Sequence, residues 1–161
     1  MRRFALLALI PLTVSAQTPD LLPVKQISLE LAHDIAMQAV EACRKDGYTV
    51  SAVVLDRAGN VQVALRDSLA SRYTLEMAER KAGLAVLSNS DTGEFREARA
   101  DIRPELNHMR GIAVLDGGMP IHAAGRLVGA VGVSGAPGGD KDAACSKAAL
   151  AAVYERLELA D

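Results

Sequence analysis

The sequence predicts one mixed α/β domain in which helices pack on a five-stranded, mostly antiparallel sheet. Three observations lead to this fold class. The chain has 161 residues, half of them hydrophobic, which suits a single domain with a sizeable core. Helical and alternating apolar patterns succeed one another along the chain. Most of the 13 glycines lie after residue 110 among short apolar runs, which is typical of strands joined by tight turns.

Residues 1–16 have the layout of a secretory signal peptide. Two arginines precede a short apolar run, and Val14-Ser15-Ala16 supplies the small residues before a cleavage site. The run is shorter than the roughly 20 apolar residues that span a bilayer, so we expect cleavage rather than a retained anchor. Residues 17–26 are then a linker and residues 27–161 a single domain. We expect this domain in the periplasm or outside the cell, without a membrane span.

The first half of the domain is expected to contain a helix, a hairpin and a second helix. Ser28 is the expected N-cap of a helix whose apolar residues have helical spacing and which ends at Asp46-Gly47. β-Branched residues over 49–55 and alternation over 61–66 flank turn residues, which predicts a β-hairpin. Residues 71–89 return to a helical pattern, whose polar side carries Glu76, Glu79, Arg80 and Lys81.

The second half of the domain is expected to add three strands and a final helix. Residues 90–110 mix charges, glycine and proline without a clean period, so we expect irregular or short helical structure there. Strands over 112–115, 120–123 and 127–133 follow, separated by turns that contain glycine. An alanine-rich helix over 140–159 ends the chain. Together with the hairpin, these segments make the five strands of the predicted sheet.

Charge and aromatic content argue against nucleic acid as a partner. The chain has 18 Lys+Arg against 20 Asp+Glu, a net charge of −2 that becomes −4 once the two leader arginines are removed. Tryptophan is absent and aromatic residues make up only 3% of the chain, so base stacking has almost nothing to use. A ligand site must therefore be built from aliphatic walls, backbone amides and a few polar groups.

Cysteine usage leaves two alternatives open. Cys43 and Cys145 are the two cysteines of the chain, one near each end of the expected domain. A long-range disulfide would suit an oxidising compartment, whereas two small buried thiols would need no partner. The sequence does not place their Cα atoms, so it does not decide between them. Their wide separation is not a zinc or iron–sulfur pattern.

Few side chains have the chemistry to hold a metal or a cofactor. Glu76 and Glu79 are three residues apart on the expected helix, so their carboxylates share a face and could bind a hard cation such as ferric iron. A solvated surface pair is the alternative. The histidines are isolated in sequence: His33 flanks the first helix, His108 lies in the irregular segment and His122 in a strand. Haem needs only one or two axial donors and an apolar slot.

A glycine-rich stretch, residues 129–139, precedes the last helix. It lacks the strand and helix context of a dinucleotide fingerprint and the lysine of a P-loop, so it gives little support for nucleotide binding. Its backbone amides lie at a helix N-terminus, where they could receive a carboxylate. Either a small ligand or a neighbouring side chain could supply that carboxylate.

Several stretches, taken in order, resemble a known family. They are Val53–Val61, Arg66-Asp67, Lys81-Ala82, Gly117–Ile121 and Leu127–Gly135. This pattern resembles the GlcG/HbpS family of small haem-binding-type domains, which also forms the C-terminal part of PduO-type proteins. The likeness extends over nearly the whole expected domain. It implies a profilin-like fold with a five-stranded antiparallel sheet, and homo-oligomers of such subunits.

The resemblance also implies a function and a set of ligands. Exported members are linked with haem binding, with haem or iron sensing beside a membrane sensor kinase, and with protection from iron-driven oxidation. By this resemblance Glu76 and Glu79 are iron ligands. His33 is the first choice as haem ligand, because PduO-type members use a histidine of the first helix, and His108 is the second. The stretch Ser68–Ser71 departs from the family's usual loop beside the expected pocket, which leaves the ligand open.

We therefore expect an exported, oligomeric protein that binds haem or a similar tetrapyrrole and stores, senses or buffers its iron. We expect a binding protein first, and the sequence does not decide whether it is also an enzyme. The sequence is also compatible with two other functions. Bound haem could be degraded through its own activation of oxygen or peroxide, without a dedicated acid–base pair. The domain could instead bind a small carboxylate such as glycolate, or a partner protein, and never meet haem.

Overall fold

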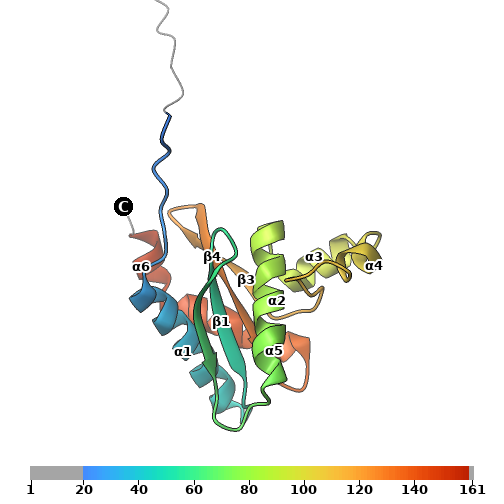
Figure 1. Cartoon of the computed structure of the whole chain (residues 1–161). Helices are drawn as coiled ribbons and strands as arrows, with labels where there is room; N and C mark the ends of the chain where they lie inside the picture. Colours follow the sequence, from blue (N-terminus) through green and yellow to red (C-terminus); the bar gives the residue numbers. More distant parts are fainter. Residues whose placement is uncertain (1–19, 160–161) are drawn as a thin grey trace, which may run out of the picture.

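The computed structural model describes residues 20–159 and shows six helices and four strands within them (Figure 1). The first half contains α1 (Leu29–Lys45), β1 (Ser51–Asp56), β2 (Val61–Arg66) and α2 (Tyr73–Ser88). The second half contains α3 (Thr92–Ala98), α4 (Arg103–Leu106), β3 (Gly118–Ala123), β4 (Arg126–Ser134), α5 (Gly139–Ala152) and α6 (Tyr154–Glu158). The expected signal peptide, residues 1–16, lies outside the described residues. No helix in the described range is long and apolar enough to cross a membrane.

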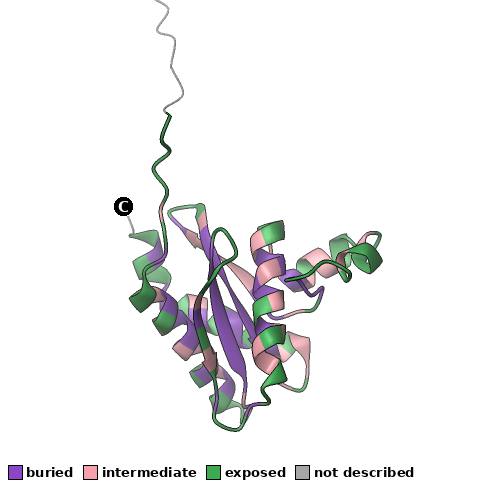
Figure 2. Ribbon diagram, viewed as in Figure 1, coloured by how far each residue is buried: buried purple, intermediate pink, exposed green. Residues whose placement is uncertain are grey.

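The described strands form one antiparallel sheet in the order β2-β1-β4-β3. β1 pairs with β2 through the predicted hairpin, and on its other side with β4, which comes from the second half of the chain. All six residues of β1 are buried, because helices cover both faces of the sheet at its centre (Figure 2). The mixed helical and antiparallel architecture agrees with the predicted fold class.

The structure corrects the expectation of a fifth strand over residues 112–115. The Ala113 N–H donates to the carbonyl oxygen of Arg80 on α2, at 2.9 Å, so this backbone bonds to a helix rather than to a neighbouring strand. Ile112 and Val114 of the segment are buried against Leu84 of the same helix, whereas Leu115 is exposed. A short apolar run has the same sequence pattern in a buried strand and in a buried loop, so the pattern did not distinguish the two structures.

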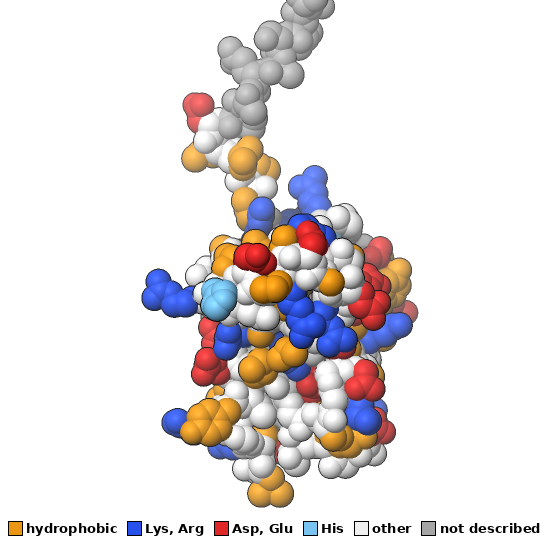
Figure 3. All heavy atoms as spheres, turned by 90° about the vertical axis from the view of Figure 1, so that its right-hand side faces the viewer, with side chains coloured by type: hydrophobic (Ala, Val, Ile, Leu, Met, Phe, Trp, Pro, Cys, Tyr) orange, Lys and Arg blue, Asp and Glu red, His pale blue; other side chains and the backbone are white. Residues whose placement is uncertain are grey.

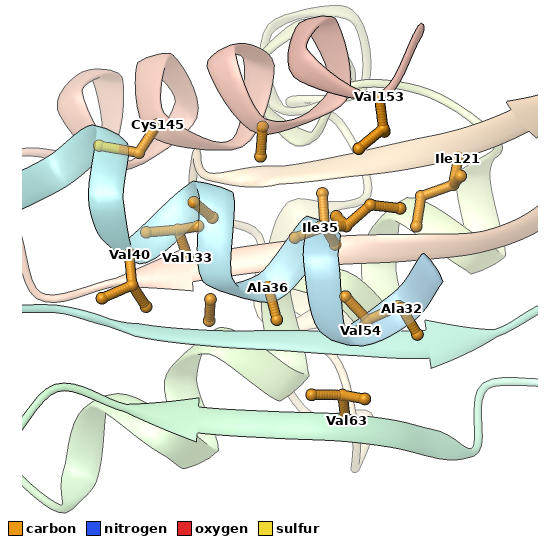
Figure 4. Close-up of a cluster of buried hydrophobic side chains, with 14 of the residues drawn as sticks. Ala32, Ile35, Ala36, Val40, Val54, Val63, Ile121, Val133, Cys145 and Val153 are labelled. Atoms are coloured by element: carbon orange, nitrogen blue, oxygen red, sulfur yellow. The ribbon is translucent and has the colours of Figure 1, made fainter. Parts of the chain in front are cut away.

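One face of the sheet is covered by α1 and α5. Ser28 caps α1 as predicted, since its Oγ accepts a hydrogen bond from the Leu31 N–H at 3.2 Å. Side chains of α1 point from the helix towards the strands, where they meet Val54 and Val133 (Figure 4). This is the main hydrophobic core, and the residues that α1 buries in it are Ala32, Ile35, Ala36, Ala39 and Val40.

A disulfide joins the two helices on this face. Cys43 of α1 and Cys145 of α5 are bonded, with a Cα–Cα distance of 5.4 Å and a sequence separation of 102. Both cysteines are buried. The structure thus decides between the two alternatives that the sequence left open, in favour of the cross-link. Every strand of the sheet lies within the loop that the cross-link closes.

The other face is covered mainly by α2, which lies very close to the strands. A Cβ atom at Gly132 of β4 would be 2.0 Å from the carbonyl oxygen of Ala78, so glycine is required for this approach. The helix presents alanines to the sheet as well, and Ala78, Ala82 and Ala85 are fully buried against β1 and β4. Small residues on both elements therefore set the position of α2.

A buried ion pair connects α2 with α5. The Lys81 ammonium donates to Asp142 Oδ2 at 2.7 Å and to the Val133 carbonyl oxygen at 3.0 Å, and both charged side chains are only 4% exposed. Asp142 Oδ1 also accepts from the Ala136 N–H at 2.9 Å. Burial raises the pKa of Asp142, although Lys81 and Ala136 favour its charged form. Lys81 was expected on the polar side of the helix, and its burial with a distant partner corrects that expectation.

Residues 92–110, which we call the α3–α4 lobe, project from the rest of the domain beside α2 (Figure 1). The prediction of irregular or short helical structure there is confirmed by helices of seven and four residues. Most of the lobe is exposed (Figure 2). Phe95 and Leu106 are partly buried against the cluster that contains Leu84, and this contact attaches the lobe to α2.

Candidate functional site

A pocket of about 440 Å³ opens between α2 and the end of the α3–α4 lobe. One wall comes from α2 and the other from residues 107–111. A volume of this order suits part of a small-molecule ligand. We call it the α2–lobe pocket, and its lining residues are Glu76, Glu79, Arg80, Asn107, His108, Met109, Arg110 and Gly111.

Backbone contacts hold the second wall of the pocket against α2. A Cβ atom at Gly83 would be 2.1 Å from the Gly111 carbonyl oxygen, so the absence of a side chain at Gly83 lets the two segments touch. Arg80 contributes twice: its carbonyl oxygen accepts from Ala113, and its Nε donates to the Ile112 carbonyl oxygen at 3.1 Å. The base of the pocket is therefore fixed, whereas its outer residues, including all of 107–111, are exposed.

The fold brings three of the predicted site residues into this one pocket. Glu76 is 72% exposed and its Oε1 lies 3.8 Å from an Nη of Arg80. Glu79 and His108 line the same pocket and make no side-chain hydrogen bond or ion pair with any residue of the range 20–159. Within that range, no group of three or more His, Cys, Asp or Glu side chains is arranged to hold a metal ion. The three side chains thus line one pocket and could supply ligand atoms to a metal, but they are not arranged as a preformed metal centre.

His33, the first choice as haem ligand, lies on α1, on the opposite face of the sheet from α2. Its side chain is 51% exposed, and its Nδ1 is 3.8 Å from Asp34 Oδ1. It lines a separate pocket of about 260 Å³ between α1 and α6. The Arg156 guanidinium donates to Asp34 at 2.7 Å and lowers the pKa of that carboxyl group. Within one subunit, His33 and His108 therefore do not face the same ligand.

The glycine-rich stretch before α5 uses an amide within the protein. The Ala136 N–H donates to the Asp142 carboxylate, so a neighbouring side chain occupies this donor. Ser146 Oγ likewise donates to the Gly117 carbonyl oxygen at 2.8 Å, which joins α5 to the turn before β3. The sequence left open whether a small ligand or a neighbouring side chain would supply the carboxylate for this stretch, and at Ala136 the structure shows the side chain of Asp142.

Sequence reasoning did not select the remaining residues of the pocket. The helical pattern placed Arg80 on the same polar side as the two glutamates, and Met109 follows His108 in the sequence. Neither position indicated that the residue lines a ligand site. Arg110 belongs to a segment without periodicity, so its direction was not predictable. Figure 3 views the molecule from the side of the α3–α4 lobe and shows acidic and basic side chains intermixed on this face.

The chain is similar to a described protein family and to a curated bacterial protein. Residues 27–151 match the model of a family described as haem degrading protein HbpS-like. Protein GlcG of Escherichia coli K12 is 29% identical over 108 residues, which cover 67% of this chain and 81% of GlcG.

Solved structures share the fold. A crystal structure of HbpS matches with a TM-score of 0.79 and 41% identity, over 87% of this chain and 99% of HbpS. A Streptomyces reticuli HbpS with two glutamates replaced by aspartates matches with a TM-score of 0.79 and 39% identity, over 91% of this chain and 98% of that HbpS chain. A complex of PduOC with haem matches with a TM-score of 0.69 and 26% identity, over 80% of this chain and 95% of the PduOC chain. The chain therefore belongs to the HbpS-like family, the family that its motifs resemble.

Proposed function

We propose that this protein is an exported haem-binding protein, that the α2–lobe pocket receives one edge of the haem, and that Glu76 and Glu79 bind iron. The observation that carries the proposal is the shared lining of the pocket, which combines two carboxylates, an imidazole and a thioether. The family description and the PduOC–haem complex support haem as the ligand. When bound, haem supplies the ligand-exchange and redox chemistry of its iron.

His108 replaces His33 as our first choice of axial ligand. Its imidazole is exposed at the pocket and has no partner among the described residues, so no existing bond must break before it binds iron. Met109 follows directly and offers a thioether, a soft donor that iron in haem accepts. His33, by contrast, lies beside the ion pair of Asp34 and Arg156.

The acidic pair suits ferric iron released from haem or supplied free. Carboxylate oxygens are hard donors, and both glutamates project from one side of α2 into the same pocket. The pair replaced in Streptomyces reticuli HbpS also consists of two glutamates three positions apart. This equal spacing supports the choice of Glu76 and Glu79.

The disulfide supports the proposed location. Disulfides persist in secreted and periplasmic proteins and are rare in the cytosol. The Cys43–Cys145 bond therefore agrees with the signal-peptide pattern of residues 1–16 and with a periplasmic or extracellular protein. Assembly into homo-oligomers and communication with a membrane sensor kinase are further parts of the proposal, supported by the family resemblance.

A haemin titration of the purified protein, followed by Soret absorbance, tests haem binding. We expect a sharp band that saturates near one haem per subunit, is lost or shifted in His108→Ala, and is kept in the matched variant His33→Ala. A broad band that never saturates would contradict haem binding. Loss of the band in His33→Ala alone would place the haem on the α1 face instead.

Ferric iron binding is tested separately by calorimetry with iron(III) nitrilotriacetate. We expect Glu76→Gln with Glu79→Gln to abolish saturable binding. The control is Glu94→Gln with Glu97→Gln, an exposed pair with the same spacing on α3, outside the pocket. Equal iron binding by wild type and both double variants would remove iron from the proposal.

The family description favours haem degradation as a second candidate function. The experiment incubates the haem-loaded protein with ascorbate in air and follows the Soret band together with released iron. Degradation predicts a progressive loss of the band, with iron release faster than from haemin alone. A band that persists, with no iron released, assigns the protein to binding only.

A further inference from the structure

Arg110 is a free guanidinium at the α2–lobe pocket. Its side chain makes no hydrogen bond or ion pair with any residue of the described range. Most other described arginines are paired, and four of them bind carboxylates at 3.2 Å or less: Arg44 with Asp67, Arg96 with Asp116, Arg99 with Asp101 and Arg156 with Asp34. Because a guanidinium offers five N–H donors and no acceptor, Arg110 is available to an anion that enters the pocket.

Arg80 faces the same pocket from α2. Its Nε is used by the Ile112 carbonyl oxygen at 3.1 Å, and an Nη lies 3.8 Å from Glu76, beyond hydrogen-bond distance. The terminal nitrogens of Arg80 therefore keep donors for a ligand. Since Ile112 is two residues from Arg110, the contact that holds this segment against α2 also keeps the two arginines on adjoining walls of one pocket.

The charges of the lining limit which ligands fit. Two guanidiniums beside the carboxylates reduce the affinity of Glu76 and Glu79 for bare ferric iron, because like charges repel, so iron binding by the acidic pair does not account for the whole lining. A site for a small carboxylate alone would be weakened by Glu76 and Glu79 in the same way. A ferric tetrapyrrole with carboxylate side chains carries both signs, a positive metal centre and negative edge groups. It therefore complements a pocket whose lining has two acidic and two basic residues.

We propose that Arg110 and Arg80 bind the carboxylate side chains of the tetrapyrrole, and that the pocket thereby selects porphyrins with free carboxylates over porphyrins without them. This inference rests on the proposed haem binding at the same pocket. Guanidinium and carboxylate groups form charge-assisted hydrogen bonds that are often bidentate, and a lysine ammonium does not reproduce the bidentate geometry. The two arginines therefore determine specificity, whereas His108 is the metal ligand.

The test compares haemin with its dimethyl ester, in which both carboxylates are blocked, in the same mixed solvent. We expect wild type to bind haemin about tenfold more tightly than the ester, the loss that one or two exposed charge-assisted bonds produce. Arg110→Gln and Arg80→Gln should weaken haemin binding and leave ester binding nearly unchanged. Arg110→Lys should restore only part of the preference.

Two controls keep the result interpretable. Arg57→Gln removes an equally free arginine from the β1–β2 turn, outside the pocket, and should change neither affinity. A thermal melt checks that Arg80→Gln still folds, since Arg80 also bonds to Ile112. Equal saturable binding of haemin and ester by wild type would overturn the inference and leave haem binding intact. If neither porphyrin binds saturably, haem binding itself is contradicted.

Discussion

The two faces of the sheet are built differently, and the difference shows where this domain can bind a ligand. On one face, α1 and α5 bury aliphatic side chains against the strands and are joined by the Cys43–Cys145 disulfide. On the other, α2 rests on glycine and alanine and is flanked by the exposed α3–α4 lobe. The first face, which we call the closed face, is filled by the main core and covalently linked, and its pocket at His33 is smaller, about 260 Å³. The second face leaves polar side chains without partners among residues 20–159 at an open pocket. Exposed and weakly packed segments commonly carry binding sites.

The largest expected effect comes from cutting the covalent link of the closed face. Cys43→Ala with Cys145→Ala opens a loop that joins residues 102 positions apart. The chain-entropy model predicts a loss of about 4–5 kcal/mol in the free energy of unfolding. Urea unfolding measures it, and wild type with dithiothreitol should lose the same amount. A loss below about 1 kcal/mol in both would show that this face holds without the cross-link.

A somewhat smaller effect is expected from the ion pair that ties α2 to α5. Lys81→Met leaves the buried carboxylate of Asp142 without its cation and should cost about 3 kcal/mol in the free energy of unfolding. The double variant Lys81→Met with Asp142→Leu removes both charges and should recover much of that loss. Urea unfolding of the two variants compares them. Equal losses would mean that the uncompensated charge is not the cause.

The attachment of the lobe is the next target. Phe95→Ala removes a partly buried ring that packs against the cluster around Leu84, and should lower the free energy of unfolding by about 1–2 kcal/mol. Hydrogen exchange followed by mass spectrometry should show faster exchange in the α3–α4 lobe while α1 keeps its protection. A uniform increase in exchange over both faces would show that the lobe does not open independently of α1.

The smallest expected effect is a pH-dependent contact at the edge of the closed face. Two nitrogens of Arg44 donate to Asp67, at 2.8 and 2.9 Å, and lower the pKa of Asp67. The stabilisation is therefore present above the unfolded pKa of about 3.9 and is lost as the pH falls through the lower folded pKa. Asp67→Asn should lower the melting temperature by about 2 °C at pH 7 and by less at pH 2. The same difference at both pH values would refute this assignment.

Local patterns predicted those elements whose partners lie nearby in sequence. The cap at Ser28 and the hairpin are examples, and in the hairpin turn Asp56 accepts from the backbone of Ala58 and Asn60 at 2.8 and 2.9 Å. Patterns failed where the partner is remote. The run 112–115 bonds to α2, and Lys81 pairs with a residue 61 positions away, so neither position could be read from its neighbours.

The candidate site was predictable in part for the same reason. Helical spacing placed Glu76 and Glu79 together, and the structure agrees. His108 joins them only through the packing of the aperiodic segment 107–111 against Gly83, which no local pattern shows. The axial role of His108, like the roles of the two glutamates, stays a prediction for the titrations above.

The disulfide also determines what proteolysis would do to this protein. The exposed α3–α4 lobe is a favourable cutting site for a protease, and it lies between Cys43 and Cys145. A single cut there would produce two chains, one carrying α1 and α2 and the other carrying β3, β4 and α5, still held together by the sulfur bridge. On a gel, the nicked molecule would migrate as an intact chain until a reductant separated the two pieces.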